Sequence, residues 1–406
     1  MRILHVLSQR PSLTGSGITL DSLVRRAAAA GHKQRVVVGV PAGDPRPDVG
    51  GLDAEHIHPL LFGAAPLDFA VPGMSDVMPY PSTRFSDLSE TRLAAYRKAW
   101  RDLLGPLIES FRPHLIQTHH VWLMSALVKD VAPLIPVVTQ CHATGFRQME
   151  LCPTLADGVR RGCARNEAFL VLHDDHRALL GSRLGIASDR IHTVGAGYRE
   201  DIFHARGRPR DPEPAILYVG KYSAAKGLPW LLEAFERLVC ERPGLQLHIA
   251  GGGSGPEADE IRVRMERMAP AVVQHGQLAQ QALADLARRA TVCVLPSFYE
   301  GLPLVLVEAL ACGCRLVATD LAGIRNELAP RLGEALTRVE LPRLETVDRP
   351  RLQDLPAFVD RLQTALAVAL EAPPLGDPAH TMPGALAHFT WDAVYGRIEP
   401  VWLGLV

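Results

Sequence analysis

Short apolar runs alternate with longer segments of helical periodicity along the whole chain. In the first half, the pattern predicts strands at 2–7, 34–40, 114–118, 136–140, 169–172 and 190–194. Intervening segments such as 90–110 and 174–184 have the pattern of helices, and Gly31 ends a first, Ala-rich helix as a C-terminal cap would. The second half repeats the alternation, with strands expected at 215–220, 245–250, 272–275, 291–296 and 315–320. This alternation predicts parallel sheets with helices on both faces.

The segment 205–214 (ARGRPRDPEP) interrupts the alternation with prolines and charges, and we interpret it as a linker. A chain of 406 residues exceeds the length at which one core stops growing, which also favours two domains. We therefore expect two doubly wound α/β domains in tandem. Facing domains of this kind place the carboxyl ends of their strands around one cleft, where ligands bind.

Composition narrows the function classes. A net charge of −1 argues against wholesale binding to nucleic acid or to acidic membranes. No apolar run reaches the roughly 18 residues of a membrane span, so we expect no integral membrane segment. The start, MRILHVLSQR, is interpreted as a strand and not as a signal peptide. Seven cysteines without a C-x-x-C pair favour reduced thiols and a cytoplasmic location, with Cys141 set apart because it opens an unusual loop.

The stretch SFYEGLPLVLVEALACGCRLVATD, residues 297–320, holds two glutamates eight apart. Glu300 lies in the loop after a predicted strand, and Pro303 suits the first turn of the helix that follows. The backbone N–H groups of Leu304 and Val305 would then be unpaired and would form a site for anions or polar oxygens. Glu308 lies further along, where it could reach hydroxyl groups. The alternative is two solvated glutamates around a core helix.

Two more loops of the second half have unusual composition. Lys221 and Lys226 bracket a short loop between a strand and a helix, which suits a diphosphate. The glycines 251–253 follow the next strand directly and would let a ligand approach the backbone. A solvated charged loop and an ordinary glycine turn are the alternatives.

Taken in order, the motifs GKYSAAKG, AGGGSGPE, VVQHGQL and FYEGLPLVLVEAL resemble the C-terminal domain of retaining GT-B glycosyltransferases of family 4, the glycosyl transferases group 1. The family hallmark E-x7-E is matched by Glu300 and Glu308. The resemblance covers most of 215–330 and extends more loosely over the first domain. It implies an α/β GT-B fold, with an acceptor-side Rossmann-like domain at 1–205 and a nucleotide-sugar-binding domain at 206–389. The C-terminal helix, about 390–406, would pack back on the first domain.

The resemblance also implies roles for individual residues. Glu300 would contact the donor sugar, Glu308 the ribose hydroxyls, and Lys221 and Lys226 the diphosphate, with Lys221 standing where arginine is commoner. His142 would lie near the donor sugar, and His142, Glu300 and Lys226 are the candidate catalytic residues. The remaining donor-site residues would contribute backbone or loop contacts: Gly15, Ser16, Gly17, Gly252, Gly253, Gln277, Leu278, Gly301, Leu302, Pro303 and Leu304.

An acceptor pocket is a hypothesis from the first domain. The stretch 72–86 lacks a strand or helix period, and long irregular loops are often functional. We expect Arg84, His119, His120 and Arg147 to shape a pocket for a small anionic acceptor. Alternatively, the arginines pair with carboxylates at the core edge. Metal binding by His119 and His120 is disfavoured, because adjacent residues on a strand point opposite ways.

The expected function is glycosyl transfer with retention of configuration, from a nucleotide sugar to a small, anionic, soluble acceptor. A UDP-sugar is the first choice of donor, ahead of GDP- and ADP-sugars. No cofactor is expected, and no D-x-D motif calls for a metal. The alternatives are a GT-B sugar-nucleotide epimerase or hydrolase, and a non-catalytic nucleotide-sugar-binding protein. An NAD-dependent oxidoreductase is disfavoured, because the first loop lacks the third glycine and no acid ends the second strand. A homodimer is left open.

Overall fold

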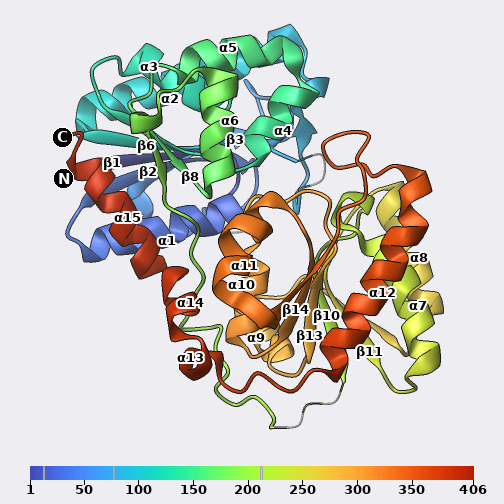
Figure 1. Cartoon of the computed structure of the whole chain (residues 1–406). Helices are drawn as coiled ribbons and strands as arrows, with labels where there is room; N and C mark the ends of the chain where they lie inside the picture. Colours follow the sequence, from blue (N-terminus) through green and yellow to red (C-terminus); the bar gives the residue numbers. More distant parts are fainter. Residues whose placement is uncertain (12–13, 76–77, 211, 213) are drawn as a thin grey trace. The chain divides into compact units, whose positions relative to one another are not determined.

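The computed structural model describes residues 1–406 except Ser12, Leu13, Asp76, Val77, Asp211 and Glu213. The chain forms two compact units, drawn in Figure 1. Unit 1 comprises Met1–Ala196 and Trp391–Val406, and unit 2 comprises Gly197–Thr390. Each is built around its own parallel sheet with helices on both faces, as the alternating pattern predicts.

Unit 1 contains a seven-stranded sheet in the order β3-β2-β1-β6-β7-β8-β9, and all its strand pairs are parallel. Six of these strands lie where the apolar runs predict them. The seventh strand, β3, was not predicted, because its sequence IHPLLF contains a proline. The strand forms nevertheless, because it lies at the edge of the sheet, where a residue without an N–H is tolerated. The strands are β1 (Arg2–Leu7), β2 (Lys33–Pro41), β3 (Ile57–Phe62), β6 (Leu115–His119), β7 (Val137–Gln140), β8 (Ala168–Val171) and β9 (Ile191–Thr193).

Helices cover both faces of this sheet because successive side chains of each strand point to opposite sides. In β1, Leu4 and Val6 pack into the core beneath α2, α3 and α5, whereas Ile3 packs on the opposite side with α1 and α15. The helices of unit 1 are α1 (Gly15–Ala29), α2 (Glu90–Phe111), α3 (Leu123–Val131), α4 (Thr144–Leu151), α5 (Pro153–Cys163), α6 (Asp174–Leu184) and α15 (Trp391–Leu403).

The stretch 72–86 has more regular structure than its sequence predicts. Two short strands, β4 (Pro72–Gly73) and β5 (Thr83–Arg84), pair in parallel, and a 3-10 turn follows at Phe85–Asp87. Strands of two residues leave no periodic pattern, so the expectation of a segment without strand or helix was wrong. Asp76 and Val77, inside the same stretch, lie outside the described residues.

The C-terminal helix α15 packs on unit 1 through a row of buried side chains, which includes Trp391 and Trp402. Trp402 is fully buried, and its indole N–H donates a 2.8 Å hydrogen bond to Oε1 of Gln117 on β6. Near the surface, Glu399 pairs with His32 at 2.9 Å and Asp392 pairs with Arg26 at 3.0 Å. The two chain ends therefore lie close together (Figure 1).

Unit 2 contains a six-stranded parallel sheet in the order β12-β11-β10-β13-β14-β15. The strands are β10 (Ala215–Lys221), β11 (Gln246–Gly252), β12 (Val272–Gly276), β13 (Val292–Leu295), β14 (Arg315–Thr319) and β15 (Leu336–Val339). The helices are α7 (Leu228–Glu241), α8 (Pro256–Arg267), α9 (Gln280–Ala287), α10 (Leu304–Ala311), α11 (Ala329–Leu332), α12 (Leu355–Glu371), α13 (Pro378–Thr381) and α14 (Pro383–His388). In both units the order reverses beside the first strand, which is the doubly wound arrangement.

The predicted linker at 205–214 is partly built into unit 2. Arg208 donates hydrogen bonds of 2.8–3.3 Å to carbonyls at the ends of two helices: Ala287, Arg288 and Ala290 at the end of α9 and after it, and Cys312 after α10. Its side chain packs against Gly313, where φ is +94° and an added Cβ would lie 2.6 Å from Arg208. Gly313 thus follows the end of α10 with the left-handed backbone that favours glycine. Asp211 and Glu213 lie outside the described residues.

The sequence predicts no membrane-spanning segment and reduced cysteines. Within the described residues, no helix is both long and apolar enough to cross a membrane. All seven cysteines are free thiols, and Cys240 alone is exposed. Cys141 is fully buried, and burial raises the pKa of its thiol, so the residue that stood out in the sequence is an unreactive core side chain.

We predict that Trp402→Ala lowers the free energy of unfolding by about 3–5 kcal/mol, the usual cost of truncating a buried tryptophan. The substitution opens a cavity and leaves the buried Gln117 oxygen without its donor. Urea unfolding followed by circular dichroism measures the change. Leu403→Ala, at the next position of the same helix and 58% exposed, is the matched control and should change stability little. Equal effects of the two substitutions would contradict the prediction.

Candidate functional site

In unit 2, the strand order reverses between β10 and β13, and the loops that follow these two strands carry Lys226 and Glu300. Ligands of doubly wound folds bind at such a switch point. Nζ of Lys226 lies 2.6 Å from Oε1 of Glu300 and donates a second bond of 3.3 Å to the carbonyl of Tyr299. Residues 74 apart in sequence thus form one site, because the topology makes their strands neighbours.

Close contact between the two loops fixes this pair. Gly227 has φ +72°, and a Cβ at this position would lie 2.0 Å from the carbonyl oxygen of Pro296. The N–H of Phe298 also donates to the carbonyl of Ala225 at 3.0 Å. Glycine is therefore required at 227 on two counts, its left-handed backbone and the neighbouring carbonyl.

Lys226 retains capacity for a ligand. An ammonium group has three N–H donors, and two of them are used by Glu300 and Tyr299. The side chains of Lys226 and Glu300 are 25% and 18% exposed, so both are accessible but partly desolvated. An anion that accepts the third N–H would also have the Glu300 carboxylate as a close neighbour.

The helix α10 begins one residue later than the sequence predicts. Pro303 is its N-cap (φ −79°, ψ 90°) and not a residue of the first turn, because the first helical bond, from the N–H of Leu306, is accepted by the Pro303 carbonyl at 3.1 Å. The N–H groups of Leu304 and Val305 thus have no acceptor within the helix. Gly301 and Leu302 lie between Glu300 and Pro303, in the loop that leads to these N–H groups.

Glu308 lies on α10 and is partly exposed. Desolvation raises the pKa of its carboxyl group to about 7. No hydrogen bond or ion pair holds this carboxyl group among the described residues, so nothing offsets the cost of charging it. Near neutral pH, Glu308 is therefore close to half-ionised and would gain most from a ligand that donates hydrogen bonds.

Two of the three glycines at the end of β11 and directly after it pack closely against neighbouring protein atoms. An added Cβ at Gly251 would lie 1.9 Å from the carbonyl of Gly220, and one at Gly253 would lie 2.9 Å from Cβ of Ala258. Packing of the protein therefore explains the absence of a side chain at both positions, and the approach of a ligand to their backbone stays a prediction. At Gly252 the nearest atom is the side chain of Gln277, at 3.8 Å.

Three further residues predicted for the donor site lie at or directly after the ends of β10 and β12. Gln277 is exposed and Leu278 is partly buried, both directly after β12. Lys221 ends β10, and its carbonyl accepts a 2.7 Å hydrogen bond from the hydroxyl of Tyr218. Tyr218 is fully buried and was not predicted as a site residue, since a tyrosine inside an apolar strand reads as core.

In unit 1, Gly15, Ser16 and Gly17 form the first turn of α1 and not a loop. The reason is Thr14, which is the N-cap: its Oγ1 accepts the N–H of Gly17 at 3.3 Å. Oγ of Ser16 donates to Oε1 of the buried Gln9 at 3.3 Å. The preceding residues Ser12 and Leu13 lie outside the described part of the chain.

Three imidazoles gather after β6 and β7. Nδ1 of His119 lies 3.2 Å from Nε2 of His142, and the ring centroids of His120 and His142 are 4.6 Å apart. We expected His119 and His120 to point opposite ways, which was wrong, because His120 leaves the strand with φ +68°. This left-handed turn brings both rings to His142, and Oγ1 of Thr144 holds Nδ1 of His120 at 3.1 Å.

Burial keeps this imidazole cluster neutral. Desolvation lowers the pKa of His142 to about 4. It also lowers the pKa of His119 and of His120 well below the ordinary value, and the positive charge that His142 carries when protonated lowers both further. His176, which the sequence did not single out, extends the cluster, and desolvation lowers its pKa to about 3. Neutral imidazoles act as hydrogen-bonding groups at pH 7, each with one donor and one acceptor nitrogen.

The cluster determines which nitrogen of His142 carries the proton. Nε2 of His119 is buried without a hydrogen-bond partner among the described residues. A buried N–H without an acceptor is rarer in proteins than an unused acceptor, so the proton of His119 belongs on Nδ1, which donates to Nε2 of His142. The proton of His142 is then on Nδ1, and this partly exposed histidine offers a ligand a neutral N–H donor.

The other predicted acceptor residues lie apart from this cluster or on its flank. Arg84 pairs with Asp87 at 3.0 Å, and its side chain is 58% exposed, which fits the alternative interpretation of a surface ion pair. Arg147 lies on α4, the helix that begins at Thr144, and is partly buried. Within the described residues, no group of three or more histidine, cysteine or acidic side chains is placed to hold a metal ion.

Two polar residues of the loops were missed. Ser297, directly after Pro296, is fully buried and its Oγ has no partner among the residues described. Thr144 orients His120. A polar residue that immediately follows a predicted strand is the signal that could have indicated Ser297.

The sequence of each unit matches a known family profile. Residues 213–338 match "Glycosyl transferases group 1" and residues 14–197 match "Glycosyl transferase 4-like domain". The chain belongs to the glycosyl transferases group 1 family. It is a GT-B glycosyltransferase of the hexosyltransferase class, which moves a sugar from a nucleotide sugar, as the motifs predicted.

Relatives of this glycosyltransferase carry the names of several different enzymes. It is 27% identical over 351 residues to a glycogen synthase of Mycobacterium tuberculosis, covering 80% of this chain and 79% of the relative. It is 36% identical over 224 residues to a phosphatidyl-myo-inositol mannosyltransferase of the same organism, covering 54% and 55%. The structure of sucrose-phosphate synthase from Thermosynechococcus elongatus superposes with a TM-score of 0.74 at 21% identity, covering 100% and 99%, and shows the shared fold.

We predict that neutral His142 carries its proton on Nδ1 at pH 7. Long-range ¹⁵N–¹H spectra of histidine-labelled glycosyltransferase, assigned with His142→Gln, identify this tautomer. His119→Asn should preserve it, because an amide N–H can replace the Nδ1 donor, whereas His119→Leu should release Nε2 and allow the other tautomer. A proton on Nε2 of His142 in the unsubstituted protein would contradict the assignment.

Proposed function

We propose that this glycosyltransferase acts with retention of configuration, that its donor is a UDP-sugar, and that its acceptor is a small anionic molecule. The observation that carries the proposal is the Lys226–Glu300 pair at the switch point of unit 2, beside the N-terminus of α10. It joins a cation, a carboxylate and unpaired backbone N–H groups, the groups that a diphosphate and a sugar require.

The roles follow from charge. In a transition state with oxocarbenium character, positive charge develops on the sugar and negative charge on the departing diphosphate. Lys226 would stabilise the diphosphate through its third N–H, together with the N–H groups of Leu304 and Val305. Glu300, held by its contact with Lys226, would position the sugar. Lys221 would contact the diphosphate as a point charge, without the bidentate geometry of arginine.

Glu308 would bind the ribose hydroxyls, and Gln277, Leu278 and Gly252 would lie near the nucleotide. In unit 1, His142 would donate its Nδ1 hydrogen to a sugar oxygen without adding charge. Gly15, Ser16 and Gly17 would offer the N-terminus of α1, which remains compatible with a phosphate contact.

The acceptor assignment rests on His119 and His120, which contact His142, on Arg147 of α4, and less on the exposed Arg84. Imidazole N–H groups and a guanidinium group suit a phosphate or carboxylate. Free thiols agree with a reducing, cytoplasmic location. A sugar-nucleotide epimerase or hydrolase would use the same donor groups, and product analysis with and without acceptor distinguishes it from a transferase.

We predict that calorimetric titration gives micromolar binding of UDP, with weaker binding of GDP and ADP. Lys226→Ala should weaken UDP binding roughly 10- to 100-fold, the cost of about one or two charge-assisted hydrogen bonds. Lys98→Ala, an exposed lysine of unit 1, is the control and should bind as the unsubstituted protein does.

A double variant separates two causes of that loss. Lys226→Ala leaves the Glu300 carboxylate without its cation, so Glu300 itself would repel a diphosphate. Adding Glu300→Gln removes this repulsion, and the double variant should regain part of the affinity for UDP. If no nucleotide binds, or if Lys226→Ala binds UDP normally, the donor assignment fails.

The pH dependence of binding should report on Glu308. Its carboxyl pKa is about 7 in the free protein, and ribose hydroxyls that donate to it would favour the ionised form. The pKa therefore falls on binding, protons are released, and affinity for UDP rises between pH 6 and 8. Titrations in two buffers of different ionisation enthalpy measure the released protons. UDP titrates in this range too, so Glu308→Gln is the control: the difference between the proteins belongs to Glu308, and identical pH profiles would exclude its role.

A further inference from the structure

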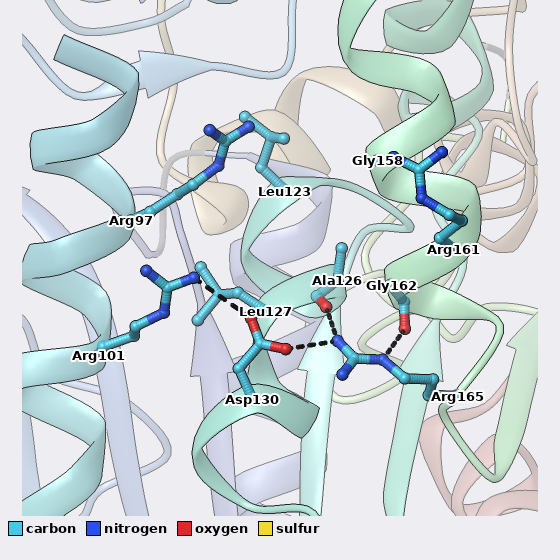
Figure 2. A pocket seen from close by; sticks show the side chains of 10 residues that line it. All are labelled: Arg97, Arg101, Leu123, Ala126, Leu127, Asp130, Gly158, Arg161, Gly162 and Arg165. Carbon is cyan, nitrogen blue, oxygen red and sulfur yellow. Dashed lines mark hydrogen bonds and ion pairs between the residues drawn. The ribbon is translucent and has the colours of Figure 1, made fainter. Parts of the chain in front are cut away.

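Unit 1 contains a second polar site, away from the loops after its strands. Helices α2, α3 and α5 border an open hollow of about 510 Å³ on the face of the sheet opposite α1 (Figure 2). Its floor is formed by α3, with Leu123, Ala126 and Leu127. Gly158 and Gly162 on α5 keep one wall low, and an added Cβ at Gly162 would lie 2.5 Å from the carbonyl oxygen of Ala126.

Four arginines and one aspartate line the hollow: Arg97, Arg101, Arg161, Arg165 and Asp130. Two of the arginines are held in place by Asp130, whose Oδ1 lies 2.8 Å from Arg165 and whose Oδ2 lies 3.3 Å from Arg101. Arg165 is fixed further by bonds of 2.9 Å to the carbonyl of Ala126 and 3.3 Å to that of Gly162 (Figure 2). One carboxylate thus orders two guanidinium groups that come from different segments.

The other two arginines are not paired. Among the described residues, neither Arg97 on α2 nor Arg161 on α5 makes a hydrogen bond or an ion pair, and Figure 2 shows them on opposite sides of the hollow. Four guanidinium groups and one carboxylate leave three positive charges unbalanced, in a chain whose net charge is −1. Like charges held together in a concave site repel one another, and an anion that binds there relieves this repulsion.

We propose that this hollow is a binding site for a soluble ligand that carries a phosphate or diphosphate group. Arginine presents a planar fork that matches phosphate oxygens, and two of the four forks are already ordered. The site is separate from the donor groups of unit 2, so the proposal does not depend on the proposed function. The leucine and alanine side chains of the floor would contact an apolar part of the same ligand.

The surroundings of the hollow favour a small molecule over a membrane or a nucleic acid. Outside it, the next charges on α2 and α5 form neutral pairs: Lys98 with Asp102 at 2.6 Å, and Arg160 with Asp157. The positive charge is therefore confined to the concave surface. Extended polyanions are bound through basic faces or grooves that continue over many phosphates.

Pyrophosphate is the probe for this proposal, measured by calorimetry on the full chain at low ionic strength. The double variant Arg97→Ala/Arg161→Ala removes two unpaired charges from the hollow. The matched control Lys98→Ala/Arg160→Ala removes two charges from the same helices outside it. We expect the first variant to lose one pyrophosphate-binding event or to weaken it roughly tenfold or more. The control should retain the affinity of the unsubstituted protein, and unchanged melting temperatures verify that both variants are folded.

Each result decides the proposal. Selective loss in the Arg97/Arg161 variant supports a phosphate site in the hollow, whether or not the Lys226 site binds UDP. Equal affinity of the two double variants overturns it. Sedimentation with phosphatidylglycerol vesicles is the second arm: binding to vesicles that requires Arg97 and Arg161, without binding of pyrophosphate, would show that the partner is a membrane and would overturn the proposal of a soluble ligand.

Discussion

The close approach of Gly227 to the carbonyl of Pro296 is the constraint on which the site of unit 2 depends. It brings the loop after β10 against the loop after β13, and only a residue without Cβ allows this. Lys226 is thereby fixed one position away, within 2.6 Å of Glu300. The pair needs no long-range organiser beyond the strand order, because β10 and β13 are neighbours in the sheet and their carboxyl ends share one edge.

The polar groups at the strand ends differ between the two units: unit 2 has an ion pair, and unit 1 has buried imidazoles. Unit 2 pairs the ammonium group of Lys226 with the carboxylate of Glu300 in a partly desolvated place. In the part of unit 1 that the structure describes, no carboxylate pairs with His119, His120 or His142, and desolvation lowers the pKa of each. The first arrangement suits a ligand whose charge changes during reaction. The second suits the orientation of uncharged oxygens, where an added charge would cost binding energy.

The sequence predicted most of the fold because parallel, buried strands are apolar runs of a length that helices rarely have. Two strands were not predicted: β3, whose proline is tolerated at a sheet edge, and β15, which comes just before an arginine- and proline-rich segment. In the sites, the motifs place Glu300, Lys226 and His142 after strands, and these residues lie there in the structure, while their roles stay predictions. The convergence of His119 and His120 was not predicted, because a single left-handed residue reverses the direction that strand alternation implies. The hollow between α2, α3 and α5 leaves no motif, since its arginines come from two helices and the start of a loop.

The net charge of the chain gives no indication of these local groups of charged side chains. At −1 the chain has almost equal numbers of acids and bases, and most of them are paired on the surface, where such pairs contribute little to stability. Among the described residues, four charged groups of the two sites keep hydrogen-bonding capacity without a partner: one N–H of Lys226, the carboxyl group of Glu308, and the guanidinium groups of Arg97 and Arg161. Folding alone leaves these groups incompletely satisfied. The first two lie where the strand order of unit 2 reverses, while the arginines face a concavity that no strand end forms, and this separation is the physical reason to treat them as two sites.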